Sequence, residues 1–338
     1  ISLYRVAKKS RVIAALIEAV KNGKQTTVNI ELRARFDEQA NLYWAEVLTN
    51  AGAKVTFGIP NLKVHAKICL ITRKERTGLV KYAHIGTGNF HEKNAKIYTD
   101  FSLFTCQPEL TKEVAQVFDF IKCPYQKFVF NHLIVSPLNS RSSFVSLIEQ
   151  EIASAKQNKP CGIILKVNNL VDHHLIKKLY KASNAGVPIK LIVRGICSLV
   201  PAIKGQSENI QVTSIIDRFL EHPRVAIFEQ EGRKQVFLSS ADWMNRNLEE
   251  RVEVTCPIYC QEIKKQIIDI INIQLADDTK ARILDSQQSN LYPVSTGESK
   301  TRSQIAIYDY LNAPRKQIST VEKENSKREN MPPIEEPA

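Results

Sequence analysis

At the start of an apolar run stands Lys63-Val64-His65-Ala66-Lys67, with Ile68-Cys69-Leu70-Ile71 behind it. Such a run predicts a buried strand. Side chains alternate between the two faces of a strand, so His65 and Lys67 are expected on the same face. That face then offers a nucleophilic imidazole next to a fixed positive charge.

A glycine-containing loop follows a second predicted strand at 80–85, in His84-Ile85-Gly86-Thr87-Gly88-Asn89-Phe90. The glycines would let backbone N–H groups and the Asn89 amide approach an anion closely, as a phosphate-binding loop requires. A lone histidine in a strand is more often structural, and a Gly-Thr-Gly sequence is usually only a turn. The two features together predict a phosphate site that contains a histidine, and a second copy would strengthen that interpretation.

The composition indicates a globular protein that is long enough for two domains, with 338 residues, 43% hydrophobic and 24% charged. The net charge of +12 favours a polyanionic partner, such as nucleic acid, anionic lipid or a phosphate polymer, without choosing among them. The seven cysteines are odd in number and form no Cys-x-x-Cys pair, which argues against a disulfide framework or a zinc site.

The sequence shows no signal peptide and no apolar run of about 18 residues. We therefore expect a cytoplasmic protein without a transmembrane segment, and association with a membrane surface stays open. The chain begins at Ile1 without a methionine, and we expect it to be a fragment of a longer protein.

Helical and strand patterns alternate along most of the chain. Apolar residues at helical spacing predict helices at 11–22, 37–51, 109–121, 142–155, 172–184 and 262–276. Strands are predicted at 26–32, 54–57, 162–167, 188–193, 210–215, 224–229, 235–239 and 252–258. This order predicts an α/β fold with mainly parallel or mixed sheets flanked by helices. We expect a first domain at 1–131, a second at 132–312 and a disordered, charged tail at 313–338.

The second half repeats the features of the first. His222-Pro223-Arg224 matches the His65-Ala66-Lys67 unit, and Ser239-Ser240-Ala241-Asp242-Trp243 matches the loop at 86–90. The histidine lies 21 residues before the loop in the first copy and 17 in the second. Two such units predict one composite site between paired domains, with His65 and His222 both catalytic.

A histidine attacks a phosphoryl group through a neutral ring nitrogen, so its pKa must stay near or below the working pH. Nearby cations lower that pKa. Phosphoryl groups carry much negative charge, so arginine forks and lysines are needed to bind them. The candidates at predicted strand ends or beside the histidines are Arg5, Arg35, Arg194, Arg251 and Lys67.

Several longer strings carry a family resemblance. They are Leu3-Tyr4-Arg5-Val6-Ala7, Glu31-Leu32-Arg33-Ala34-Arg35-Phe36-Asp37-Glu38, Tyr82-Ala83-His84-Ile85-Gly86-Thr87-Gly88-Asn89-Phe90, Leu191-Ile192-Val193-Arg194-Gly195, Leu220-Glu221-His222 and Leu238-Ser239-Ser240-Ala241-Asp242-Trp243-Met244. In this order they resemble the catalytic C-terminal half of the polyphosphate kinase family. The resemblance runs from residue 1 to 312 and implies two tandem domains similar to phospholipase D.

The resemblance implies reversible transfer of the γ-phosphoryl group of ATP to inorganic polyphosphate. His65 would carry the group as a phosphohistidine, and His222 would assist the transfer. Contacts with the nucleotide phosphates are implied for Tyr98, Arg194 and Arg251. The motifs themselves add Lys67 and Asn89 as residues that bind ATP or polyphosphate.

The same resemblance places Arg5 and Arg35 at a site for Mg²⁺ and phosphate. A guanidinium is cationic, so we expect both arginines to hold phosphates that in turn hold the metal. ATP, ADP and inorganic polyphosphate are the expected partners, with no specific nucleic acid. Members of the family carry an N-terminal helical domain and a head domain before this point and form homo-oligomers. Both domains are absent here, so we expect weak turnover from this fragment.

Two other functions stay open. A phosphodiesterase of the phospholipase D type would use two histidines, but that class has His-x-Lys in both halves, and the second half here has His222-Pro223-Arg224. A non-catalytic basic module that binds polyanions is compatible with the charge of +12 but gives the paired histidines no purpose.

Overall fold

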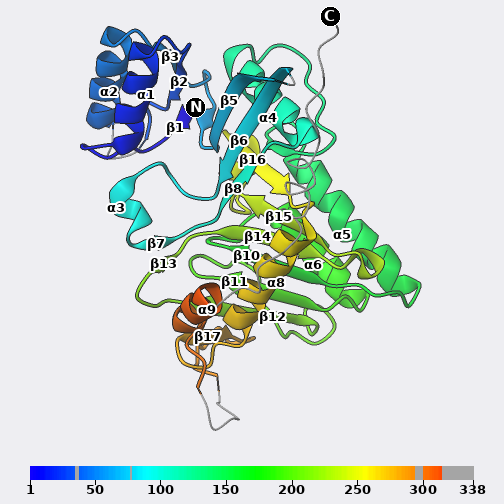
Figure 1. Cartoon of the computed structure of the whole chain (residues 1–338). Helices are drawn as coiled ribbons and strands as arrows, with labels where there is room; N and C mark the ends of the chain where they lie inside the picture. Colours follow the sequence, from blue (N-terminus) through cyan, green and yellow to red (C-terminus); the bar gives the residue numbers. More distant parts are fainter. Residues whose placement is uncertain (35–37, 77, 294–299, 314–338) are drawn as a thin grey trace, which may run out of the picture.

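The computed structural model describes residues 1–34, 38–76, 78–293 and 300–313. Its helices and strands form an α/β fold with mixed sheets, which confirms the predicted class. Figure 1 shows a small lobe at the N-terminus, a hairpin beside it and a large sheet with helices on both faces. The predicted tail lies, from residue 314 onward, outside the described residues.

The N-terminal lobe is a parallel sheet covered by two helices. Its elements are β1 (Ser2–Leu3), α1 (Arg11–Lys21), β2 (Thr27–Ile30), α2 (Glu38–Asn50) and β3 (Lys54–Phe57). Helix α1 begins where predicted, because the Ser10 hydroxyl accepts a hydrogen bond from the Ile13 N–H at 3.3 Å. The apolar core of the lobe fixes the end of β1, where Tyr4 is buried.

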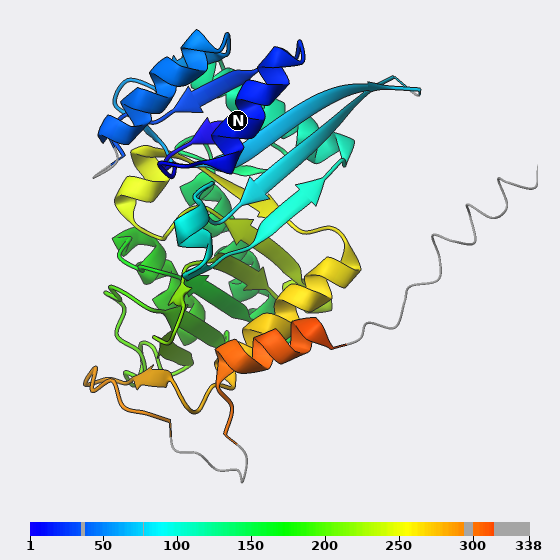
Figure 2. The same ribbon diagram turned by 60° about the vertical axis from the view of Figure 1, so that its left-hand side comes forward.

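The other long strands of the first half form a separate antiparallel sheet. It consists of β5 (Lys67–Glu75), β6 (Gly78–Gly86) and β8 (Ser102–Thr105), and helix α4 (Pro108–Lys122) packs against it. Glu75 pairs with Gly78, so the connection is too short for the crossover that parallel strands need. The first half thus contains two small sheets instead of one. In Figure 2 the β5–β6 hairpin projects beyond the rest of the fold.

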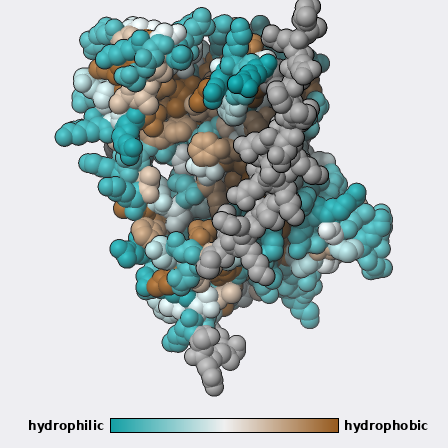
Figure 3. Space-filling view, in the orientation of Figure 1, coloured by the Kyte–Doolittle hydropathy of each residue, from teal (hydrophilic) through white to brown (hydrophobic). Residues whose placement is uncertain are grey.

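One face of this antiparallel sheet carries exposed apolar side chains. Ile71 pairs with Tyr82, and Phe104 pairs with His84, so these four side chains share a face. The His84 ring packs between Phe90 and Phe104, with centroids 5.0 Å from each. Ile71, Tyr82 and Phe104 are exposed. Figure 3 shows apolar surface in this region of the molecule.

The second half builds most of a nine-stranded sheet. Its strands in spatial order are β17 (Ala281–Leu284), β12 (Ile210–Ile215), β11 (Ile189–Val193), β10 (Ile163–Val167), β14 (Arg224–Phe228), β15 (Gln235–Ser239), β16 (Arg251–Pro257) and β4 (Lys63–Val64), with β9 (Ile134–Ser136) beside β16. Helices α5 (Ser140–Lys156) and α6 (His173–Asn184) pack on one face, and α8 (Gln261–Leu275) packs on the other. Strand β11 is therefore apolar on both sides, with Leu191 facing α5 and α6 and Ile192 facing α8.

Main-chain pairing joins the two halves of the chain at two places. Strand β4 comes from the first half and pairs with the start of β16, where Val64 lies opposite Val252. His65 therefore follows directly beside Glu253. The second pairing joins β7 (Tyr98–Thr99) to β13 (Leu220–Glu221).

Short helices α3 (Glu92–Ala95) and α7 (Asn245–Glu249) follow the two small-residue loops. At the end of the described chain, β17 and helix α9 (Ser303–Asn312) have no counterpart among the predicted elements. Helix α9 carries apolar residues on its exposed side as well, among them Ile305, Tyr308 and Leu311, so its apolar residues do not mark one buried face.

Within the described parts of the chain, every helix is too short or too polar to cross a membrane. All seven cysteines are free in the structure. Cys256 is buried, whereas Cys106 and Cys260 are exposed.

Candidate active site

His65 is held between the two halves of the chain. Its backbone N–H donates to the Val252 carbonyl of β16 at 2.9 Å, which places its ring beside Glu253. Nδ1 of His65 lies 2.9 Å from both carboxylate oxygens of Glu253. The Tyr4 ring packs edge-on against the imidazole, with centroids 4.6 Å apart. Only 9% of His65 is exposed.

Lys67 lies on the same face as His65, as the period of the strand predicts. Its Nζ donates to the His65 carbonyl at 2.5 Å and lies 2.9 Å from Nδ1 of the same histidine. The Lys67 side chain is fully buried. It therefore helps to fix the His65 ring as well as supplying charge.

The protonation of His65 follows from these contacts. Burial lowers the pKa of His65 to about 3, because the opposing effect of Glu253 is smaller and Lys67 lowers it further. Burial alone would raise the pKa of Glu253, but its charged neighbours hold it at about 2. Since the carboxylate is ionised and can only accept, Nδ1 carries the proton of the neutral ring. Nε2 is left with its lone pair.

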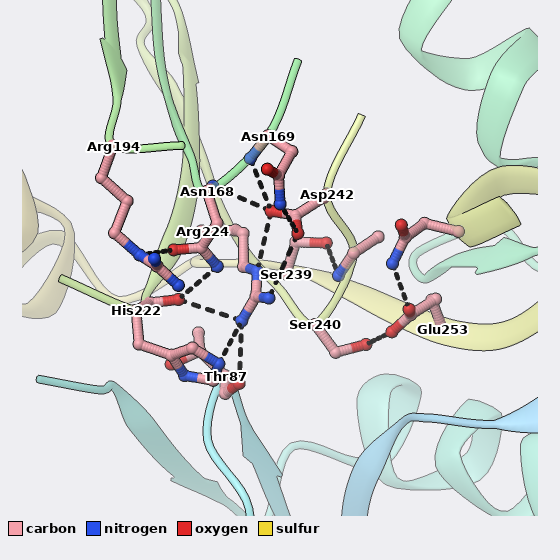
Figure 4. Close-up of polar contacts among 12 residues, drawn as sticks. Thr87, Asn168, Asn169, Arg194, His222, Arg224, Ser239, Ser240, Asp242 and Glu253 are labelled. Atoms are coloured by element: carbon pink, nitrogen blue, oxygen red, sulfur yellow. Dashed lines mark hydrogen bonds and ion pairs between the residues drawn. The ribbon is translucent and has the colours of Figure 1, made fainter. Parts of the chain in front are cut away.

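His222 stands in the matching position of the second half. Its Nδ1 lies 2.8 Å from Oδ1 of Asp100. Arg224, two residues on, donates from Nη1 to the His222 carbonyl at 3.0 Å and to Nε2 at 3.1 Å. Burial and Arg224 lower the pKa of His222 to about 4. Figure 4 shows Arg224 between His222 and Asp242.

The two carboxylates occupy equivalent places in the repeat. Thr87 donates from Oγ1 to Asp100 at 2.6 Å, and Ser240 donates from Oγ to Glu253; both pairs are 13 residues apart. In each half, the residue after the carboxylate donates its backbone N–H to the same hydroxyl. Phe101 donates to Thr87 at 2.9 Å, and Val254 donates to Ser240 at 3.1 Å. Each half therefore supplies the carboxylate that orients the histidine of the other half.

The two histidine units share one electrostatic environment. Burial lowers the pKa of Lys67, Glu253 opposes this, and Arg224 and Arg251 lower it further. Lys67 in turn contributes to the lowered pKa of His222. Charges of the first unit therefore act on the second, as a composite site requires.

Asp242 anchors the cations of the second half. Its Oδ1 accepts from Nε of Arg224 at 3.2 Å and from the Asn168 N–H at 2.8 Å. These donors outweigh the effect of burial and lower the pKa of Asp242 to about 2. Asn168 in turn orients Arg194, because its Oδ1 accepts a hydrogen bond from Nε of Arg194 at 2.7 Å. Arg194 thus lies at the end of β11 with its side chain directed to this cluster (Figure 4).

The remaining predicted residues take different positions. Nη1 of Arg251 lies 3.9 Å from Glu253, and the Tyr98 ring lies 5.1 Å from the His222 ring. The guanidinium of Arg5 lies 6.0 Å from the centre of the Tyr4 ring, which packs on His65. Arg35 lies outside the described residues.

The loop at 86–90 differs in one respect from the expectation. A Cβ at Gly88 would lie 2.2 Å from Oδ2 of Asp100. The anion that the Gly88 backbone approaches closely is therefore the Asp100 carboxylate. Asn89 keeps a buried Oδ1 without a hydrogen-bond partner among the described residues.

Comparisons with known proteins show the family of this chain. Residues 1–127 match the family model "Polyphosphate kinase C-terminal domain 1", and residues 133–304 match "Polyphosphate kinase C-terminal domain 2". The chain belongs to the polyphosphate kinase family. A polyphosphate kinase from Vibrio parahaemolyticus is 55% identical over 317 residues, which are 94% of this chain and 46% of the relative. One from Escherichia coli K12 is 52% identical over 313 residues, which are 93% of this chain and 46% of the relative.

A solved structure also resembles this chain. The polyphosphate kinase from Porphyromonas gingivalis superposes with a TM-score of 0.84 and 42% sequence identity, over 92% of this chain and 47% of that one. The chain therefore spans about half the length of the polyphosphate kinases that it matches.

The acidic side chains of the site do not form a metal cage. Among the residues that the structure describes, no group of three or more His, Cys, Asp or Glu side chains is placed to hold a metal ion. Glu253 and Asp100 are already engaged by the two histidines. The described side chains therefore do not fit a Mg²⁺ ion bound by protein ligands alone.

Sequence reasoning missed the carboxylates that orient the histidines. Glu253, Asp100 and Tyr4 touch the imidazoles or support them, yet none was assigned a role from the motifs. The 13-residue spacing from the loop hydroxyl to the carboxylate occurs in both halves and could have indicated Asp100 and Glu253. Tyr4 lies inside a quoted motif but reaches His65 only through the fold.

Proposed function

We propose that this chain is the catalytic part of a polyphosphate kinase, in which His65 carries a phosphoryl group between ATP and inorganic polyphosphate. The observation that carries the proposal is the contact between Nδ1 of His65 and the ionised Glu253. It holds the proton on Nδ1 and leaves Nε2 as a neutral nucleophile. A histidine that is to attack phosphorus needs this tautomer.

In the first step, Nε2 of His65 attacks the γ-phosphorus of ATP. An N–P bond forms, the bond between phosphorus and the β–γ bridging oxygen breaks, and ADP leaves with that electron pair. In the second step, a terminal oxygen of polyphosphate attacks the same phosphorus and the N–P bond breaks. The Nδ1 proton stays with His65 throughout, and the positive charge of the phosphorylated ring is balanced by Glu253. Because the steps mirror each other, the reaction is reversible.

The cations of the site bind the phosphates in this proposal. Arg194 and Arg251 offer planar forks from the ends of β11 and β16. Lys67 donates one N–H to the His65 carbonyl, and because a protonated Nδ1 cannot accept, its other N–H groups are available for phosphate. Tyr98 and Asn89 are the proposed neutral contacts with the nucleotide and the polymer. Arg5, near the Tyr4 ring, is the proposed further phosphate ligand.

His222 is proposed to assist the second transfer. Asp100 holds its Nδ1, and Nε2 faces Arg224, so the pair presents an imidazole and a guanidinium together. Mg²⁺ would neutralise phosphate charge when it arrives with the nucleotide, held by phosphates that Arg5 and Arg35 bind. No step above depends on a metal ligand from the protein.

The test is to incubate this chain with [γ-³²P]ATP and Mg²⁺ and to follow label on the protein. We expect label that is acid-labile and alkali-stable, absent from His65→Ala and transferred to added polyphosphate. His173→Ala, at an exposed position on α6, is the control and keeps the label. Label that survives in His65→Ala overturns the assignment. Hydrolysis of phosphodiesters without a labelled protein supports a phosphodiesterase instead. The absence of both a labelled protein and hydrolysis supports a binding module.

A further inference from the structure

The residue before His222 is a buried glutamate that contacts four different elements. Glu221 is 2% exposed, and its Oε2 accepts from Nζ of Lys166 on β10 at 2.9 Å. The same oxygen accepts from Gln274 on α8 at 2.8 Å and from Thr99 on β7 at 3.3 Å. Burial alone would raise the pKa of Glu221, but Lys166 and the hydrogen bonds from Gln304 and Gln274 lower it. Glu221 is therefore an ionised side chain that ties the residue before His222 to the surrounding elements.

The other oxygen of Glu221 is bound by helix α9. Oε1 accepts from Nε2 of Gln304 at 2.7 Å. The Gln304 amide also donates to the Phe219 carbonyl at 2.8 Å and accepts from the Phe219 N–H at 3.0 Å. It thus pairs with the main chain of the loop before β13 as a neighbouring strand would. At the N-cap of α9, Arg302 donates from Nε and Nη2 to the two carboxylate oxygens of Asp217, at 2.8 and 2.5 Å.

These contacts lead directly to the reacting groups of the second half. β13 pairs with β7, so fixing Glu221 also fixes Tyr98 and Thr99. The Thr99 hydroxyl accepts from the His222 N–H at 3.4 Å, and the next residue, Asp100, binds the His222 ring. We propose that Gln304 of α9 is a positioning residue, which acts through Glu221 and β13 to hold His222 and Asp100 in their working arrangement. The catalytic part of this inference rests on the proposed function.

Two substitutions at Gln304 separate positioning from space filling. Gln304→Ala removes all three hydrogen bonds. Gln304→Glu has nearly the same shape, but it loses the donors to Glu221 and Phe219 and places a second carboxylate against Glu221. A side chain that only fills space would tolerate Glu, whereas a positioning amide would not. Tyr308→Ala on the same helix is the control, because Tyr308 is 68% exposed.

The first measurement needs no activity. Imidazole signals in heteronuclear NMR spectra of the full chain, assigned with His222→Ala, give the pKa of each histidine. The groups facing His222 are Asp100, Arg224, Lys67 and the Tyr98 ring. Burial is the largest cause of its low pKa, so loosening β13 in either Gln304 variant should raise the pKa of His222 from about 4 towards 6.5. The pKa of His65 should stay at about 3, which also shows that the fold is intact.

The second measurement separates the two transfer steps. We expect both Gln304 variants to label His65 from ATP at the normal rate, and to pass the label to polyphosphate roughly 10- to 100-fold more slowly. An unchanged pKa of His222 in both variants overturns the inference, even where labelling is normal. A shifted pKa in a protein that takes no label from ATP keeps the positioning role of Gln304 and overturns the proposed function instead.

Discussion

His65 belongs to the first half of the chain, yet its Nδ1 is held by Glu253 of the second half at 2.9 Å. The converse contact joins His222 of the second half to Asp100 of the first at 2.8 Å. Each half therefore depends on a carboxylate of the other half to hold Nδ1 of its histidine. Main-chain pairing of β4 with β16 and of β7 with β13 sets these contacts, so the geometry of the site depends on how the halves pack.

Replacing Glu253 should impair the attack step. Gln has the same shape, but its amide can donate to Nδ1 and so favour the tautomer in which Nε2 carries the proton. We expect Glu253→Gln to take up label from [γ-³²P]ATP roughly 10- to 100-fold more slowly, as losses of a supporting hydrogen bond to histidine generally do. Glu250→Gln removes the same charge at an exposed position nearby and should label normally. Equal rates for both variants would show that Glu253 does not select the tautomer.

Replacing Asp100 should affect the other step. Asp100→Asn keeps an acceptor oxygen but removes the negative charge that attracts the Nδ1 N–H of His222, and it leaves the contacts of His65 in place. We expect uptake of label to stay near normal, and release of label to polyphosphate to fall roughly 10- to 100-fold. A pulse with labelled ATP followed by unlabelled polyphosphate measures both steps. Asp119→Asn, exposed on α4, is the control, and an equal loss in both steps would argue against separate roles for the histidines.

Stability should fall as the solution becomes mildly acidic. The pKa is lowered to about 3 for His65 and to about 4 for His84 and His222, mainly by burial. Between these values and the unfolded value of 6.5, the unfolded chain binds more protons, so the free energy of unfolding rises with pH. The slope is up to about 1.4 kcal/mol per pH unit for each histidine. This part of the free energy of unfolding is lost as the pH falls from 6.5 to 4.

Urea unfolding at pH 7, 6 and 5 measures this slope. The His84→Phe variant keeps the packing against Phe90 and Phe104 but removes one of the three titrating groups. Its slope should be lower by the contribution of one proton. The carboxylates of Glu253 and Asp242, with a pKa of about 2, add to the loss only at more acidic pH. A free energy of unfolding that stays constant from pH 7 to 5 would contradict the assignment of these histidines as neutral and buried.

The fold could be predicted where local patterns decide it. Apolar periodicity predicted α1, and alternation placed His65 and Lys67 on one face. The repeat indicated that His222 would occupy the matching position in the second half. The pairing of β4 with β16 could not be predicted, because a two-residue strand has too little sequence to specify its partner. The role of Glu253 depends on that pairing, so it was missed as well.

Removing the guanidinium of Arg224 should destabilise the second half. Arg224 and Asp242 are each 5% exposed, and their atoms pair at 3.2 and 3.4 Å. Arg224→Met keeps much of the volume but leaves the buried carboxylate without its cation, which generally costs about 3–5 kcal/mol of unfolding free energy. Arg233→Met, at an exposed position, should change little. The double variant Arg224→Met with Asp242→Asn removes the unpaired charge and should recover part of the loss. Unfolding of Arg224→Met at the same urea concentration as the parent chain would show that the pair contributes nothing to stability.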